Sequence, residues 1–253
     1  INSNLTSVMD FNLAFIVPTA FTDTNIPDDG KAQGLFNIYV SMANDFLYPD
    51  PNSVLIFLDN HDLGRFSTTE DVGLNKYKQG VAFILTTRGI PQIYYGTELL
   101  FTGTKQQGDG VIRKDMPGGW EGDEIDLFTE EGRKAQTHNT DGLKVEKGQA
   151  ADLFDYVSRL FQWRKTKDVI HNGKTLHFMT RDNTYGYFRY DDDDVVFVYI
   201  NNSNEPKNVP WTYYSEISEG LKGGVDVLTG EQCEVSDATV VAPQTALVVE
   251  YKR

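Results

Sequence analysis

The stretch SVLIFLDNHDLGR, residues 53–65, places an almost unbroken apolar run directly before a cluster of polar side chains. Apolar runs of this kind are typical of strands that are covered on both faces, as in parallel sheets. Asp59, Asn60, His61 and Asp62 then fall at the carboxyl end of the predicted strand. In barrels of alternating strands and helices, active sites are built at that end. The stretch therefore predicts a parallel sheet with a candidate site at the tip of one strand.

The segments on either side continue the alternation of strand and helix. Ahead of it, Ser7–Phe11 (SVMDF) predicts a strand, Pro18–Gly30 a loop, and Lys31–Leu47 an amphipathic helix. After it, Leu74–Thr87 predicts a helix and Gly89–Tyr95 a short strand. The apolar stripe expected on the first of these helices consists of Leu35, Ile38, Tyr39, Met42 and Phe46.

The pattern changes towards the end of the chain. Residues 96–148 are Gly-rich with weak periodicity, which predicts a long loop that is either functional or disordered. Ala150–Arg164 predicts a further helix. The later strand-like runs, separated by turn residues, are Thr175–Thr180, Thr184–Tyr190, Val195–Asn201, Gly224–Leu228 and Thr245–Tyr251. They predict a small antiparallel sandwich. We therefore expect two domains, residues 1–168 and 169–253, with Asp191–Asp194 forming a solvated turn rather than a cation site.

Composition narrows the class of protein. The formal net charge is −14, from 37 acidic and 23 basic residues, which argues against a nucleic-acid partner because phosphates require clustered Lys and Arg. No apolar run approaches the roughly 20 residues that span a bilayer, and Ile1–Asp10 carries no signal-peptide pattern. Cys233 is the only cysteine, so neither an internal disulfide nor a thiolate metal cluster is expected.

The polar cluster after the central strand has two readings. An Asx turn that closes the strand would explain Asn60 and Asp62, but it leaves His61 and Arg65 unexplained. A carboxylate beside a histidine and an arginine suits recognition of vicinal hydroxyl groups and of a developing positive charge. These side chains therefore predict a site for a neutral, hydroxyl-rich ligand such as a sugar.

Three motifs in order resemble those of the α-amylase superfamily. FLDNHDLGR, residues 57–65, is similar to the signature of its seventh barrel strand, and GIPQIYYGTE, residues 89–98, is similar to its eighth strand and following loop. GDGVIRKDMPGGW, residues 108–120, resembles a loop of its neopullulanase and cyclomaltodextrinase-like members. The resemblance covers the whole chain. It implies an α/β fold, the C-terminal part of a (β/α)8 TIM barrel (strands 6 to 8), followed by an antiparallel β-sandwich domain.

The resemblance also implies roles in glycosidic bond cleavage. Asp62 corresponds to the acid that stabilises the oxocarbenium-like transition state, His61 to a residue that holds the same sugar ring, and Asn60 and Arg65 to residues that shape the site. The nucleophile and the acid/base of a retaining enzyme lie about 5 Å apart, and the family places them after strands four and five. We therefore expect them upstream of this chain, which would make it an inactive C-terminal half. Asp10, at the sixth strand, is expected only to form hydrogen bonds at the strand end.

Further candidates lie in the loops after the eighth strand. Tyr95 and Glu98 either line the pocket or stabilise a turn, and Arg113 and Asp115 form either a structural or a substrate-facing pair. Trp120 either stacks on a sugar face or anchors its loop, because aromatic rings suit the apolar face of glucose.

The remaining aromatic and imidazole side chains are expected to be structural. Trp163 is predicted to pack in the core or between the domains. The cluster Trp211, Tyr213 and Tyr214 favours strand packing over a surface glucan site. The isolated histidines lack metal-ligand spacing; they are His138, His171 and His177.

The leading function is hydrolysis of α-glucosidic bonds in starch-derived oligosaccharides by the parent enzyme. The alternatives are a non-catalytic α-glucan-binding module and a glycosyl-transferring or inactive member of the same superfamily. The expected partners are an α-glucan or maltooligosaccharide and, because half a barrel leaves sheet edges unpaired, a second copy or the missing half. No cofactor is expected in the chain, and a calcium site built from upstream residues stays open. By analogy, a bacterial periplasmic or extracellular location is favoured over a cytoplasmic one.

Overall fold

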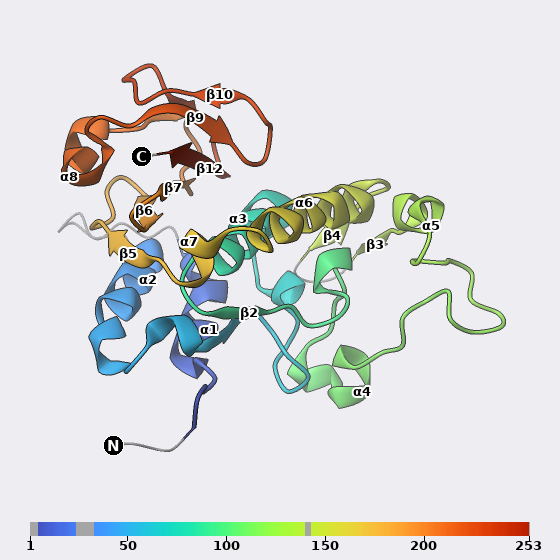
Figure 1. The fold of residues 1–253 in the computed structure, drawn as a ribbon. Helices are drawn as coiled ribbons and strands as arrows, with labels where there is room; N and C mark the ends of the chain where they lie inside the picture. The colour runs from blue at the N-terminus through green and yellow to red at the C-terminus, as the bar shows by residue number, and fades with distance from the viewer. Residues whose placement is uncertain (1–4, 24–32, 140–142, 253) are drawn as a thin grey trace.

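The structure is a computed structural model that describes residues 5–23, 33–139 and 143–252. A helical part containing two short parallel strands lies on one side, and an antiparallel β domain lies on the other (Figure 1). No helix of the described ranges is long and apolar enough to cross a membrane.

Three extended segments run parallel in the helical part, in the order expected for the sixth to eighth strands of a barrel. β1 (Leu55–Phe57) pairs with β2 (Ile90–Gln92), with Ile56 opposite Pro91. On the other side of β1, Met9 forms an isolated parallel bridge with Leu55. The neighbouring parallel strands confirm the predicted barrel portion.

The first predicted strand is mostly replaced by a helix. Only the bridge at Met9 remains of Ser7–Phe11, because α1 (Phe11–Ala20) begins at Phe11. The Asp10 carboxylate caps this helix by accepting the Leu13 N–H at 2.9 Å, which satisfies a donor that the first turn leaves free. Pro18, predicted to open a loop, lies inside α1, and the loop residues from 24 onward lie outside the described ranges.

The three longer helices lie where their apolar periodicity predicts them. They are α2 (Gln33–Ala43), α3 (Gly73–Thr86) and α6 (Gln149–Arg164). Leu35, Ile38 and Met42 of α2 are buried. The prediction for Phe46 was wrong: its side chain is 79% exposed, because α2 ends at Ala43 and a 3-10 turn, η1 (Asp45–Leu47), redirects the chain.

The segment 96–148 is built from short elements. These are η4 (Thr97–Leu99), η5 (Lys105–Gln107), α4 (Asp109–Ile112), α5 (Glu130–Ala135), β3 (His138–Asn139) and β4 (Lys144–Val145). The chain between α4 and α5 reaches out from the body of the molecule (Figure 1). Three short helices complete the helical part: η2 (Pro51–Ser53), η3 (Phe66–Thr68) and α7 (Asp168–His171).

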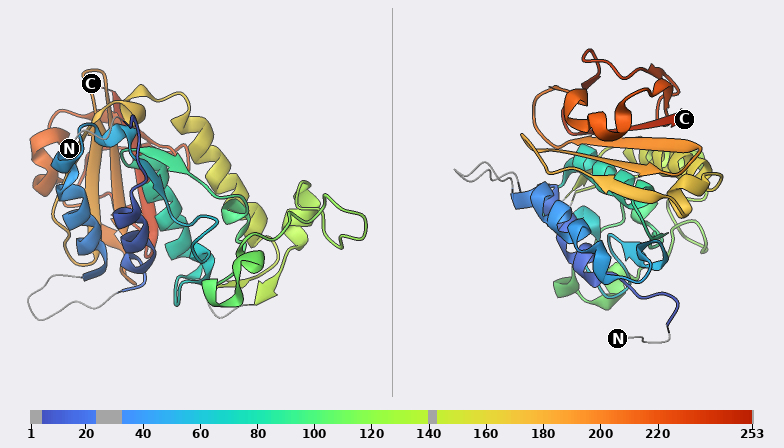
Figure 2. Two further views of the ribbon diagram at one scale, coloured as in Figure 1. Left: turned by 90° about the horizontal axis from the view of Figure 1, so that it is seen from below. Right: turned by 60° about the vertical axis from the view of Figure 1, so that its left-hand side comes forward.

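The β domain contains a six-stranded antiparallel sheet in the order β10-β9-β12-β7-β6-β5. Its strands are β5 (Lys174–His177), β6 (Thr184–Tyr190), β7 (Asp194–Asn201), β9 (Lys222–Asp226), β10 (Gln232–Cys233) and β12 (Thr245–Lys252). A second layer consists of β8 (Lys207–Asn208), η6 (Trp211–Tyr214), α8 (Ser215–Ser218) and β11 (Val240–Val241). The right-hand view of Figure 2 shows the large sheet between this layer and the helices. This arrangement confirms the predicted sandwich.

Alternate residues of the sheet face different cores, as the pleat requires. On β7, Val196, Val198 and Ile200 belong to the core shared with the helices, whereas Phe197 and Tyr199 belong to the core under the second layer. The shared core joins the two expected domains, and the boundary between residues 168 and 169, at the start of α7, stays a prediction.

The aromatic side chains of the β domain are packed, as predicted. Trp211 is 4% and Tyr214 3% exposed, and both lie in the core under the second layer. Trp163 donates its indole N–H to Glu250 at 3.0 Å, which links α6 to β12. The run Asp191–Asp194 is a turn in which the Asp191 carboxylate accepts two backbone N–H groups.

Candidate active site

The polar residues after β1 form a tight turn at the carboxyl end of the strand. Asn60 is 1% exposed, and its side-chain oxygen accepts the backbone N–H groups of Asp62 at 2.8 Å and Leu63 at 3.0 Å. Asn60 thus forms the Asx turn that one reading of the sequence expected. The turn leaves the His61 and Asp62 side chains 60% and 58% exposed.

His61, Asp62 and Arg113 form one exposed polar cluster. The His61 Nε2 lies 3.2 Å from the Asp62 Oδ2, and the Arg113 Nη2 lies 2.9 Å from the Asp62 Oδ1. Arg113 also donates from Nε to the His61 carbonyl oxygen at 2.8 Å. Asp109 holds the same guanidinium, with its Oδ2 2.9 Å from Nη2. The cluster offers a carboxylate, an imidazole and a guanidinium to a ligand from one surface.

Arg65 supports this cluster from below rather than facing a ligand. It is 1% exposed and donates to the carbonyl oxygens of Tyr95 at 2.7 Å and Ile112 at 3.0 Å. Its guanidinium lies 4.1 Å from the centre of the Tyr94 ring, a cation–π contact. Arg65 thereby ties the turn after β1 to the loop after β2 and to α4.

Asp59 joins the ends of the two strands. Its carboxylate accepts the Phe66 N–H at 2.9 Å and the Thr97 hydroxyl at 2.8 Å. Burial raises the pKa of Asp59, opposed by these two hydrogen bonds and by the charge of Arg65. The buried carboxylate fixes the position from which Asn60, His61 and Asp62 emerge.

Two further ionisable groups near Arg65 are shifted by their surroundings. Burial raises the pKa of Glu98, whose Oε2 is a buried atom without a hydrogen-bond partner. Burial, and secondarily the charge of Arg65, lowers the pKa of Lys114. Both groups are therefore easier to neutralise than their exposed counterparts.

The other predicted site residues are placed differently. Tyr95 is 37% exposed and donates its hydroxyl to the Lys114 carbonyl oxygen at 2.8 Å. Asp115 is exposed, and the carboxylates that hold Arg113 are Asp62 and Asp109 instead. Trp120 is 66% exposed on the segment that extends from the body of the molecule (Figure 1). The structure thus joins Arg113 to the cluster but leaves Asp115 and Trp120 outside it.

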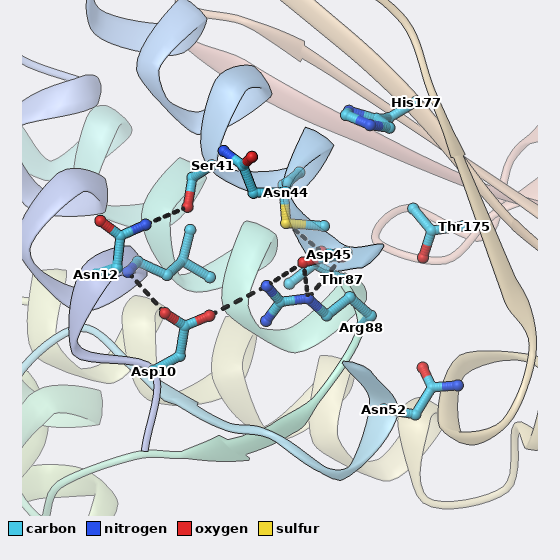
Figure 3. A network of polar contacts seen from close by, with 12 residues as sticks. Asp10, Asn12, Ser41, Asn44, Asp45, Asn52, Thr87, Arg88, Thr175 and His177 are labelled. Carbon is cyan, nitrogen blue, oxygen red and sulfur yellow. Dashed lines mark hydrogen bonds and ion pairs between the residues drawn. The ribbon is translucent and has the colours of Figure 1, made fainter. Parts of the chain in front are cut away.

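Asp10 belongs to a separate buried network on the amino-terminal side of β1 and β2. Arg88, just before β2, pairs with Asp10 at 3.0 Å and with Asp45, which precedes β1 (Figure 3). Both Arg88 and Asp10 side chains are 1% exposed. Asp10 therefore has the hydrogen-bonding role that the sequence predicts.

The sequence reasoning missed Asp109, Thr97 and Tyr94. Asp109 precedes Arg113 by four residues, a spacing that brings helical side chains together. The ion pair between Asp109 and Arg113 could therefore have been predicted from the sequence GDGVIR. The contacts of Thr97 and Tyr94 depend on how two strand ends meet, which has no local signal. Within the described ranges, no group of three or more His, Cys, Asp or Glu side chains could hold a metal ion.

Two family models together match most of the chain. The family model "Alpha amylase, catalytic domain" matches residues 2–188, and "Cyclo-malto-dextrinase C-terminal domain" matches residues 175–250. The chain belongs to the α-amylase family.

The similar curated proteins are longer than this chain. A cyclomaltodextrin glucanotransferase of Bacillus sp. (strain 6.6.3) is 28% identical over 97% of the chain, which spans 30% of that protein. An α-amylase of Niallia circulans is 26% identical over 95% of the chain, which spans 40% of that protein. The chain thus spans about a third of the length of these relatives.

Solved structures share the fold. The structure of Eubacterium rectale Amy13B superposes with a TM-score of 0.71 at 19% identity. The superposition covers 100% of this chain and 49% of the Amy13B chain. An α-amylase from Geobacillus thermoleovorans, solved in complex with acarbose, gives a TM-score of 0.64 at 18% identity, covering 98% of this chain and 48% of its own.

Proposed function

We propose that this chain supplies the transition-state-stabilising side of an α-glucan-cleaving active site, with Asp62 as the stabilising acid. The exposed cluster of His61, Asp62 and Arg113 at the carboxyl end of β1 carries the proposal. Asp62 would accept hydrogen bonds from the hydroxyl groups of the sugar ring, and these strengthen as the ring flattens towards an oxocarbenium ion. The relatives named for cyclomaltodextrin and amylase activities support a substrate made of α-linked glucose.

The surroundings of Asp62 prepare it for this role. Arg113 occupies one carboxylate oxygen, and the imidazole of His61 lies beside the other, so the carboxylate is oriented before a ligand arrives. Asn60 and Arg65 act beneath the surface: Asn60 holds the turn, and Arg65 connects it to the loop after β2. In this proposal Tyr95 forms part of the wall, while Asp115 and Trp120 contact longer substrates only.

The chemistry requires two further carboxylates. In a retaining double displacement one attacks the anomeric carbon while the other protonates the departing oxygen, and water then releases the sugar. Asp109 is committed to Lys105 and Arg113, and Asp59 is buried against backbone and hydroxyl donors. We propose that the nucleophile and the acid/base come from polypeptide outside this chain, so the chain alone should not cleave maltoheptaose. Cleavage that persists through repeated purification would contradict this.

Sugar binding by the chain tests the role of Asp62 directly. We expect maltoheptaose to perturb the His61 ring resonances in an NMR titration, and Asp62→Ala to weaken binding about tenfold or more, because a hydrogen bond to a charged group contributes roughly 1.5–3 kcal/mol. Asp237→Ala, at an exposed position of the β domain, is the matched control and should leave the affinity unchanged. Equal affinity of the two variants would refute the assignment.

Glycosyl transfer is a second candidate, because several similar proteins are glucanotransferases. In an active assembly, cyclic or elongated glucans would appear from maltoheptaose before reducing sugar accumulates. A purely glucan-binding role for the β domain is less well supported, since Trp211 and Tyr214 are buried in its core.

A further inference from the structure

A cavity of about 400 Å³ lies where the helical part meets the β domain. Asp45 and Asn52 on its wall precede β1, so it lies towards the amino ends of the strands, opposite His61 and Asp62. Thr175 and His177 of β5 and Arg189 of β6 line its other side. In the view of Figure 3, Asn52, Thr175 and His177 lie on the side of Arg88 away from Asp10.

Arg189 is a buried cation without a carboxylate partner among the described residues. It is 1% exposed and donates to the Asn52 side-chain oxygen at 2.8 Å, the Ile170 carbonyl oxygen at 2.9 Å and the Thr175 hydroxyl. Its Nε is a buried atom with no hydrogen-bond partner. A buried guanidinium without a counter-charge is costly, because its desolvation is not offset by an ion pair.

The neighbouring charges compensate this positive charge only in part. Arg88 engages both oxygens of Asp45 as well as Asp10, so neither carboxylate is free to neutralise Arg189. Burial, and then the charge of Arg164, lowers the pKa of Arg189 to about 10, which leaves it charged at neutral pH.

The other titratable groups on the cavity wall are Lys174, His177 and Asp45. Lys174 is exposed at the edge of the cavity and adds a second positive charge. Burial lowers the pKa of His177, opposed by Asp45, so the imidazole is neutral at neutral pH and bonds to the Tyr185 hydroxyl at 3.0 Å. The Asp45 carboxylate also faces the cavity, and its pairing with Arg88 reduces its repulsion of an anion.

We propose that this cavity binds phosphate or a small phosphate monoester, with Arg189 and Lys174 supplying the charge and Asn52, Thr175 and His177 supplying hydrogen-bonding groups. Arg189 contributes mainly its positive charge to this role, because its Nη1 and Nη2 already donate to protein acceptors and only Nε has no partner. The cavity volume of about 400 Å³ falls in the range of small-molecule sites, roughly 300–1,000 Å³, so it has room for an ester as well as for the free ion. The site is separate from the proposed sugar cluster.

Isothermal titration of the chain with inorganic phosphate and with glucose 1-phosphate tests the site at neutral pH and constant ionic strength, with chloride as the reference anion. We expect one saturable site for at least one probe, and the tighter probe identifies the free ion or the ester as the ligand. Lys174→Glu should weaken binding about tenfold or more through charge reversal. Lys222→Glu, the same change on β9 towards the opposite edge of the sheet, should alter it less than about twofold.

Asn52→Asp provides a second test that does not remove a buried group. Its carboxylate would take the place of the oxygen that already accepts from Arg189, and so provide the missing counter-charge within the chain. We expect this variant to raise the unfolding midpoint by roughly 2–4 °C and to lose binding of both probes. Absence of saturable binding in the parent chain, or unchanged binding in Asn52→Asp, would overturn the proposal.

Discussion

The Asp59 carboxylate is held inside the protein by two donors, the Phe66 N–H and the Thr97 hydroxyl, yet burial still raises its pKa above the ordinary 3.8. A folded-state pKa above the unfolded value means that the folded protein binds the proton more tightly. Asp59 therefore favours folding at low pH, and this contribution is lost as the pH rises from about 4 through the folded-state pKa.

Asp59→Asn should remove this pH dependence while keeping the contacts. The amide oxygen can accept the Phe66 N–H, and the amide nitrogen can donate to the Thr97 hydroxyl oxygen. We expect the urea midpoint of the variant, relative to the parent chain, to increase between about pH 4 and pH 7. Asp237→Asn, at an exposed position, controls for the loss of one charge. A constant difference between Asp59→Asn and the parent chain across this range would contradict a raised pKa for Asp59.

Arg65 should be a stability determinant as well as a support for the site. Arg65→Ala leaves the Tyr95 and Ile112 carbonyl oxygens without their donor and opens a space over Tyr94. We expect the free energy of unfolding to fall by about 2–4 kcal/mol. Arg181→Ala, which removes an exposed guanidinium over Tyr213, should cost no more than about 1 kcal/mol. Similar urea midpoints for the two variants would show that Arg65 is not a structural support.

The sequence predicts the position of the candidate site better than its contacts. His61 and Asp62 follow an apolar strand, so their place at its carboxyl end is readable from pattern alone. Whether Arg113 pairs with Asp115 or with Asp62 depends on a loop 51 residues further along the chain folding back over the turn. Such long-range contacts are set by tertiary packing, and no local propensity encodes them.

Some helices and strands are likewise predictable from the sequence, and others are not. α3, α6 and the long strands of the β domain have strong periodicity and lie close to their predicted positions. α1 was missed because FNLAFIVPTA is apolar on nearly all sides and contains Pro18, so it has no helical stripe to read. The short elements between residues 96 and 148 lack periodicity, and their positions depend on caps such as Thr104 with Gln107.

The start of β2 depends on a glycine. Gly89 has φ of +100°, and a Cβ there would lie 2.6 Å from the Val54 carbonyl oxygen, which accepts the Ile90 N–H at 2.8 Å. Gly89→Ala should therefore cost about 1–3 kcal/mol and disturb the pairing of β1 with β2. Gly110→Ala in α4, where a Cβ has open space, is the control. Urea unfolding of both variants measures the difference, and equal midpoints would show that the backbone at Gly89 relaxes freely.

The barrel portion leaves apolar surface at its edge. Met9, Phe11 and Phe15 are 40%, 41% and 61% exposed along the bridge and helix that precede β1. An incomplete barrel exposes unpaired strand groups together with such side chains, and both favour association.

We expect the chain to self-associate in sedimentation velocity at micromolar concentrations, and Phe15→Glu to shift it towards monomer. Phe128→Glu, on the extended segment and 66% exposed, should have a smaller effect. A parent chain that stays monomeric throughout the concentration range would contradict self-association through this apolar edge.

Both faces of the large sheet in the β domain are buried: Val198 packs towards the helices, and Phe197 packs towards the second layer. The indole of Trp163 and the ammonium of Lys167 also reach across to Glu250. In a chimera that exchanges this domain among family members, the sheet residues that face the helices must therefore still fit the helices against which they pack. Crossovers that separate the large sheet from the helices packed against it should yield insoluble products far more often than crossovers within the second layer.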